Sequence, residues 1–153
     1  MHITLAFIGE YSDPEAVVEA LEQVEFSPFD IKMDRIGCFD ELWWTGFAES
    51  EELDKLARSV RRALAGAGIP YDKTKFKAHV TFLRRAKNMD KSRLDINFQP
   101  HVSFLRRAKM REGRQLAVNF KAAGMKVDCI SLMRSDRGKN GMIYTELGSV
   151  NGW

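Results

Sequence analysis

Residues that build metal sites and disulfides are scarce in this sequence. It contains three histidines and two cysteines, and Cys38 and Cys129 lie far apart, without the spacing of a metal or redox motif. We therefore expect two reduced cysteines in or near the core. No cysteine or carboxylate stands at ligand spacing from a histidine, which argues against a zinc site. We expect neither a metal nor any other cofactor.

Long apolar runs are also missing. No segment is apolar over the roughly 20 residues that span a bilayer, and no charged start followed by an apolar stretch marks export. A length of 153 residues with a hydrophobic fraction of 44% is typical of a soluble globular protein. We expect a single domain over residues 1–153, located in the cytoplasm and without a membrane partner.

Positive charge is rare in the first part of the chain and concentrated later. Residues 1–72 hold 6 Lys/Arg against 15 Asp/Glu, whereas residues 73–115 hold 13 against 3. Such a basic segment attracts phosphates and other anions, because like charges gathered on one surface add their fields. The alternative is a solvated basic face with no ligand.

All three histidines share one local pattern. His2, His79 and His101 are each followed two places on by a hydroxyl residue, namely Thr4, Thr81 and Ser103. Ser and Thr make up 14 of the 153 residues, so the chance of this coincidence is roughly one in a thousand. In a β-strand, side chains two apart lie on the same face. Each pattern therefore predicts a proton carrier beside a neutral hydroxyl donor.

Two of these patterns lie in a tandem repeat. Residues 79–87, HVTFLRRAK, return at 101–109 as HVSFLRRAK, and aligning 79–100 with 101–122 gives 11 identities in 22 positions. Two copies are too few for a solenoid, so a local duplication is the simpler explanation. Only one copy can form the second histidine motif of a site, and both His79 and His101 remain candidates.

The hydrophobic pattern predicts alternating strands and helices. Helical spacing of apolar residues and a Ser12 or Asp13 cap before Pro14 predict helices over 12–24 and 50–67. Runs rich in branched and aromatic residues predict strands at 2–9, 29–39, 42–47, 78–86, 101–109, 124–135 and 142–150. Residues 40–41 and 134–141 read as hairpin turns. The order indicates an α+β protein with largely antiparallel sheets.

Two such His-x-Thr strands facing each other across a cleft would suit one reaction in particular. One imidazole can activate water while the other protonates a departing oxygen, and hydroxyls with an arginine can hold the phosphoryl oxygens. In-line cleavage of a cyclic phosphodiester requires this set of groups. Imidazoles, with a reference pKa near 6.5, can serve as acid and as base at neutral pH without a metal.

The motifs resemble a known family. HITLAFIGE (2–10) and FKAHVTFLRRAK (76–87) are similar to the two motifs of the two-histidine (2H) phosphoesterases, and more closely to the bacterial RNA 2',3'-cyclic phosphodiesterases, also called 2'-5' RNA ligases. LWWTGF, AGIPYDKTKFKAH and ISLMRSDRGKNGMIYTEL resemble further family segments. The resemblance implies a bilobal α+β fold around a basic cleft. It also implies metal-independent hydrolysis of RNA 2',3'-cyclic phosphate ends to 2'-phosphates, with reversible 2'-5' ligation.

Carried over by position, the resemblance assigns roles to five residues. His2 and His79 would be the catalytic pair, with His2 as acid and His79 as base by family analogy. Thr4 and Thr81 would bind the phosphate through their hydroxyls, and Arg84 would face it with its guanidinium group. The partner implied is RNA, or a nucleotide, with a cyclic phosphate end.

Two features depart from the family pattern. Measured back from SLMRS, the second motif fits His101 better than His79, which would bring in Ser103 and Arg106 instead. Family members also have a strand and helix before their first motif, which we expect this chain to lack, leaving a sheet edge that a homodimer could cover. A noncatalytic RNA-end or nucleotide-binding module derived from this family is the alternative function. Trp43 and Trp44 alternate faces, so one is expected in the core while the other could stack on a base.

Overall fold

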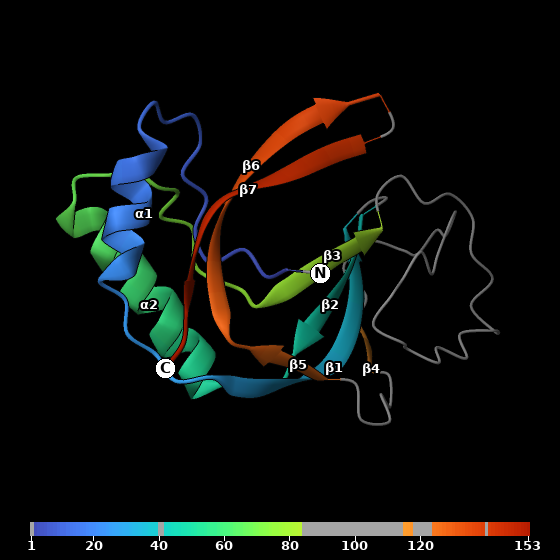
Figure 1. Cartoon of the computed structure of the whole chain (residues 1–153). Coiled ribbons are helices and arrows are strands. Elements are labelled where there is room, and N and C mark those ends of the chain that lie inside the picture. Colours follow the sequence, from blue (N-terminus) through green and yellow to red (C-terminus); the bar gives the residue numbers. More distant parts are fainter. Residues whose placement is uncertain (1, 40–41, 84–114, 118–123, 140) are drawn as a thin grey trace. The chain divides into compact units, whose positions relative to one another are not determined.

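A computed structural model describes residues 2–39, 42–83, 115–117, 124–139 and 141–153 (Figure 1). The described helices and strands form an α+β fold, as expected. The elements are α1 (Pro14–Glu22), β1 (Phe29–Phe39), β2 (Leu42–Phe47), α2 (Glu51–Gly66), β3 (His79–Leu83), β4 (Gln115–Ala117), β5 (Gly124–Val127), β6 (Cys129–Gly138) and β7 (Gly141–Asn151). The second repeat copy, 101–109, and the turn at 40–41 fall outside the described residues, as does the predicted strand beyond Leu83.

The chain divides into two compact units. The sheet unit comprises the chain up to Thr4, Asp30–Ser50 and Lys77–Met125, and the helical unit comprises Leu5–Phe29, Glu51–Phe76 and Lys126–Trp153. Each unit is formed by segments that are distant from one another in the sequence. Each unit is therefore held together by tertiary packing and not by chain continuity alone.

An antiparallel sheet forms the sheet unit, with the strand order β3-β2-β1-β4 and with β5 also paired to β1 (Figure 1). The bounds of β1 and β2 equal the predicted ranges, because both runs are rich in branched and aromatic residues. Ile31, Met33 and Phe47 are buried. The buried Thr45 hydroxyl donates to the Arg35 carbonyl at 3.1 Å, so its polar atom is satisfied.

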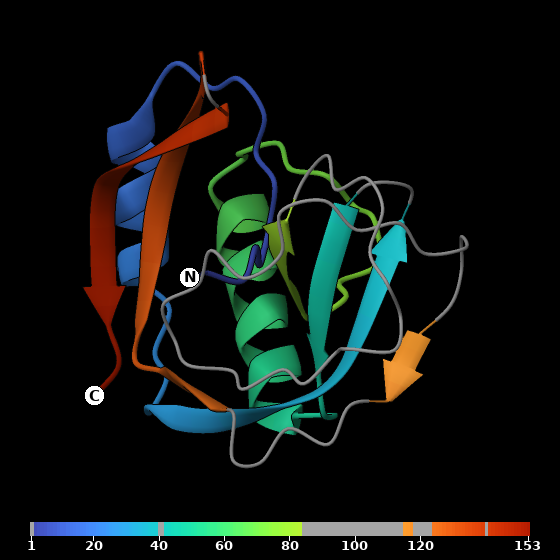
Figure 2. The same ribbon diagram turned by 90° about the vertical axis from the view of Figure 1, so that its right-hand side faces the viewer.

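The helical unit contains both helices and the β6–β7 hairpin. Asp13 caps α1 by accepting a hydrogen bond from the Ala16 amide at 3.1 Å, as the sequence predicted. In α2 the predicted apolar positions are buried, namely Leu53, Leu56, Ala57, Val60 and Leu64. Helix α1 packs against α2 and against β6 and β7 (Figure 2). No helix in the described ranges is both long and apolar enough to cross a membrane.

A hairpin joins β6 and β7 as predicted, but the turn is shorter than the expected 134–141 because β6 continues to Gly138 and β7 begins at Gly141. Strands β6 and β7 pair in antiparallel register as far as Gly138 opposite Gly141. Gly141 has φ = 140°, a conformation that residues with a side chain rarely adopt. This explains why glycine stands at the close of the turn.

The predicted strand over residues 2–9 is wrong, because these residues form no ladder with a strand in the described part of the chain. Their carbonyl groups bond elsewhere: the Phe7 carbonyl accepts from the Asp72 amide at 2.7 Å, and the Leu5 carbonyl accepts from Arg61 Nε at 3.1 Å. These two carbonyl groups thus accept hydrogen bonds from a loop amide and a helix side chain and not from a neighbouring strand. The period of two survives in part, since His2 and Thr4 are exposed while Ile3 is half-buried.

Two smaller predictions also need correction. Cys129 is a free thiol but is exposed and not in the core, because the alternation of β6 buries its neighbour Ile130 instead. The strand β4 was not predicted, since its three residues carry no periodic signal of their own. It exists because it pairs with β1.

Candidate active site

Three strands of the sheet unit bring the second histidine motif into register with residues of β1 and β2. Gly46 lies opposite His79 on one side and opposite Arg35 on the other, and Trp44 lies opposite Thr81. Since positions two apart in a strand share a face, His79, opposite Gly46, belongs to the same face of the sheet as Trp44, and the backbone of Thr81 lies opposite Trp44. This face is the candidate active-site surface.

Trp44 supports the His79 ring. The two rings meet edge to face, with centroids 6.5 Å apart and an interplanar angle of 76°. The Trp44 side chain is 9% exposed and is therefore packed within the protein, whereas the side chain of His79 is exposed. The burial of Trp44 confirms that one of the two tryptophans belongs to the core.

A backbone carbonyl selects the tautomer of His79. Its Nδ1 atom lies 2.7 Å from the carbonyl oxygen of Lys77. A carbonyl oxygen can only accept, so Nδ1 must carry the proton, and in the neutral ring the lone pair lies on Nε2. The ring is thereby prepared to accept a proton at Nε2, as a general base must.

The first motif belongs to the same compact unit as the sheet. The chain up to Thr4 groups with β1, β2 and β3, and the side chains of His2 and Thr4 are both exposed. Partial burial of the ring lowers the pKa of His2, and the positive charge of the residue 1 amino group adds a smaller effect in the same direction. In the unliganded protein His2 is therefore mostly neutral at pH 7.

Arg84 and the alternative second motif, His101, Ser103 and Arg106, lie outside the described residues. For Thr81 the register of its backbone is defined. Among the described residues, no three His, Cys, Asp or Glu side chains gather as metal ligands would.

Comparison with known families decides the classification. A sequence profile described as the 2'-5' RNA ligase superfamily matches residues 1–139 of the chain. The protein belongs to the 2'-5' RNA ligase superfamily. The matched region of this superfamily member includes the His2 motif, the His79 motif and the alternative motif at His101.

Two curated relatives of this superfamily member come from archaea, and both are named RNA 2',3'-cyclic phosphodiesterase. The protein of Archaeoglobus fulgidus is 37% identical over 103 residues, covering 63% of this chain and 57% of the relative. The protein of Aeropyrum pernix is 35% identical over 91 residues, covering 54% of this chain and 52% of the relative. The aligned region thus spans little more than half the length of each relative.

Solved structures support the α+β fold of this superfamily member. Escherichia coli LigT complexed with 3'-AMP matches 98% of this chain and 75% of that chain, with a TM-score of 0.68 and 21% identity. The protein TT0787 of Thermus thermophilus matches 98% of this chain and 76% of its own, with a TM-score of 0.63 and 22% identity. At this identity the likeness shows the fold alone.

One cluster of residues beside the candidate site was not predicted from the sequence. Asp34, Arg35 and Gly46 lie beside the His79 motif, and none was singled out from the sequence. A signal for part of this cluster existed, because the hairpin predicted from the sequence would pair Phe39 with Leu42 and, in the same register, Arg35 with Gly46, as β1 and β2 do. The register of β2 with β3 has no such local signal, because α2 separates the two strands along the chain, so the row that joins Arg35 to His79 comes from the structure.

Proposed function

We propose that this protein hydrolyses RNA 2',3'-cyclic phosphate ends to 2'-phosphates. The observation that carries the proposal is the His79 ring, which holds its Nδ1 proton on the Lys77 carbonyl and leaves Nε2 available, in the same unit as the His2 motif. The names of the two archaeal relatives support this reaction. The basic composition of residues 73–115 supports an anionic substrate.

In the proposed reaction the two histidines act on opposite sides of the phosphorus atom. His79 Nε2 takes a proton from water, the water oxygen bonds to phosphorus, and the bond from phosphorus to the ribose O3' breaks. His2 gives its proton to O3', so the products are a 2'-phosphate and a 3'-hydroxyl. The hydroxyls of Thr4 and Thr81 and the guanidinium of Arg84 hold the nonbridging oxygens as charge builds on them. Proton exchange with solvent then restores both rings.

The role of His2 as acid depends on the bound substrate. Its pKa is lowered in the free protein, mainly by burial, which favours the neutral ring. A bound phosphate brings a negative charge close to the imidazole, and an opposite charge favours the protonated form. Substrate binding therefore raises the pKa of His2 and supplies the proton that the departing O3' requires.

The decisive experiment is product identification in the absence of metal. We expect the protein to convert cytidine 2',3'-cyclic phosphate to the 2'-phosphate, followed by 31P NMR, at the same rate with and without EDTA. Loss of turnover on chelation, or formation of the 3'-phosphate, would contradict the mechanism. Binding of the 2'-phosphate without any turnover would instead support a noncatalytic RNA-end binding module.

A further inference from the structure

Arg35 shares a row of the sheet with His79. Read across strands β4, β1, β2 and β3, the register places Ala117, Arg35, Gly46 and His79 side by side. Residues opposite each other in neighbouring strands lie on the same face. The charged end of Arg35 and the His79 ring therefore belong to one surface, separated by the strand that contains Gly46.

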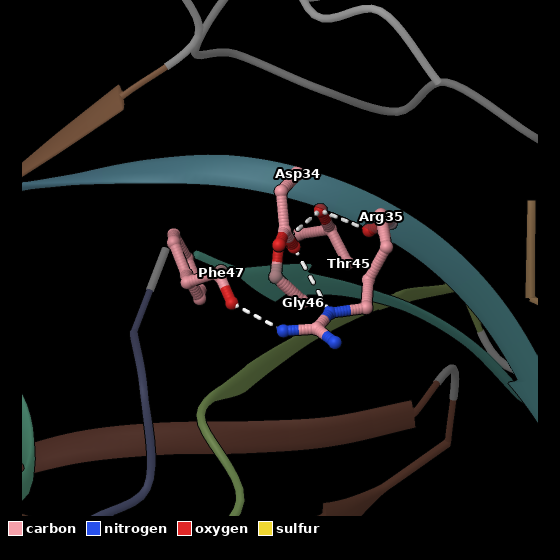
Figure 3. A network of polar contacts seen from close by, with 5 residues as sticks. All are labelled: Asp34, Arg35, Thr45, Gly46 and Phe47. Carbon is pink, nitrogen blue, oxygen red and sulfur yellow. Dashed lines mark hydrogen bonds and ion pairs between the residues drawn. The ribbon is translucent and has the colours of Figure 1, made fainter. Parts of the chain in front are cut away.

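The glycine lets the arginine lie flat across β2. A Cβ atom at Gly46 would lie 2.7 Å from Cγ and 2.8 Å from Nε of Arg35, distances at which one of the groups must move. The side chain of Arg35 thus occupies the space that a side chain at position 46 would fill, on the face of His79. Its guanidinium group donates from Nη2 to the Phe47 carbonyl at 2.7 Å (Figure 3).

A β-bulge adds the second partner of the guanidinium group. Met33 pairs with Phe47 and Arg35 with Gly46, so Asp34 is an extra residue between them. A bulge interrupts the usual alternation of faces, which lets the adjacent Asp34 and Arg35 meet. The Nε atom of Arg35 lies 2.9 Å from Asp34 Oδ1, while Nη1 points away from both partners (Figure 3).

This ion pair leaves Arg35 able to bind an additional anion. Both side chains are 39% exposed, and an ion pair in such contact with water is weak. Within the described part of the chain, Asp34 and the Phe47 carbonyl take two of the five N–H donors of the guanidinium group. The remaining donors suit a phosphate oxygen, which forms charge-assisted hydrogen bonds with arginine.

The position of the guanidinium group indicates which phosphate it binds. The backbone of Arg35 is two strands, about 10 Å, from that of His79, and its guanidinium group reaches over Gly46 of β2. There it binds the Phe47 carbonyl, on the side of Gly46 that is away from the row of Trp44 and Thr81. A phosphate held between His79 and Thr81 is therefore displaced from Arg35. Resting on the function proposed above, we propose that Arg35 binds the phosphodiester that precedes the cyclic phosphate in an RNA chain, so that the site prefers RNA ends to cyclic mononucleotides.

The test compares two substrates that differ in that one phosphodiester. The readout is the ratio of kcat/KM for a dinucleotide ending in a 2',3'-cyclic phosphate to kcat/KM for the cyclic mononucleotide. Arg35→Gln should lower this ratio about tenfold, the effect of losing a hydrogen bond between charged groups. Arg35→Lys keeps the charge and should lower the ratio less. The exposed Arg62→Gln on α2 is the control and should leave the ratio unchanged.

Asp34→Asn separates substrate binding from a purely structural role. The carboxylate competes with the phosphodiester for Arg35, so its neutralisation should raise the ratio about two- to fivefold. If the Asp34–Arg35 ion pair only stabilised the bulge, Arg35→Gln and Asp34→Asn would both lower the free energy of unfolding. Neither substitution would then change the ratio of the two kcat/KM values. An unchanged ratio in Arg35→Gln, or equal losses on both substrates, overturns the proposal.

A protein without turnover would refute the proposed function but would still test this inference. Binding of a dinucleotide with a terminal 2'-phosphate would then be compared with binding of the 2'-mononucleotide by calorimetry. Arg35→Gln should weaken binding of the dinucleotide about tenfold relative to binding of the mononucleotide. If both ligands bind the wild-type protein equally well, Arg35 does not contact the second phosphate.

Discussion

We expect His79→Ala to lower kcat for the proposed cyclic phosphate hydrolysis by about 10²- to 10⁴-fold, the contribution that a positioned general base makes to a rate. The imidazole has its Nδ1 proton on the Lys77 carbonyl and its ring against Trp44, so the substitution removes the nitrogen, Nε2, that is positioned to accept the proton. His2→Ala should lower kcat by a similar factor, because in the proposed reaction the departing oxygen would then lack its acid. The measurement is single-turnover hydrolysis of the cyclic dinucleotide with EDTA present.

Controls for these variants come from the fold and from the repeat. His79 is exposed, so His79→Ala should keep the wild-type thermal melt, and loss of activity then reports on chemistry. His101→Ala identifies the active copy of the repeat. If His101→Ala abolishes turnover while His79→Ala is active, the second motif is the one at 101 and the assignment of His79 is wrong.

Replacing Phe47 by alanine destabilises the protein by about 3–5 kcal/mol. Its side chain is 2% exposed in β2, and its backbone pairs with Met33 and accepts from Arg35. Truncation removes the buried ring and leaves a cavity that a paired strand cannot close. The free energy of unfolding, measured by urea denaturation, should fall by that amount.

A matched control is available for this prediction. Phe7→Ala removes the same side chain from a position that is 62% exposed, and its effect should stay within about 0.5 kcal/mol. Equal destabilisation by the two substitutions would contradict the placement of Phe47 in the core. It would also remove the support that β2 gives to the candidate site.

The sequence predicted those elements whose signal is local. The helix cap at Asp13, the apolar stripe of α2 and the alternating residues of β1 and β2 all act within a few neighbours along the chain. The strand predicted over 2–9 failed because a strand needs a partner, and pairing is a tertiary property. The carbonyl groups of Leu5 and Phe7 instead accept hydrogen bonds from the Arg61 side chain and from the amide of a loop residue. The short strand β4 was missed for the same reason.

The candidate site shows the same division between local and tertiary information. The His-x-Thr spacing and the family resemblance named His2 and His79, and residue spacing placed Thr81 on the face of His79. The hydrogen bond that selects the His79 tautomer and the bulge that joins Asp34 to Arg35 depend on backbone geometry, which no residue pattern encodes. These features emerged only from the folded sheet.

The central claim, that His2 and His79 act on one phosphate, can be tested by NMR because the chain has three histidines. The imidazole nitrogen resonances of all three, assigned with single Asn variants, would be followed while a cytidine 2'-phosphate ligand is added at several pH values. We predict that His2 and His79 shift with the same dissociation constant while His101 does not. We also predict that the pKa of His2, lowered below its usual 6.5 in the free protein, rises on binding. A ligand that shifts only one of these two rings, or shifts His101 in place of His79, would contradict the account.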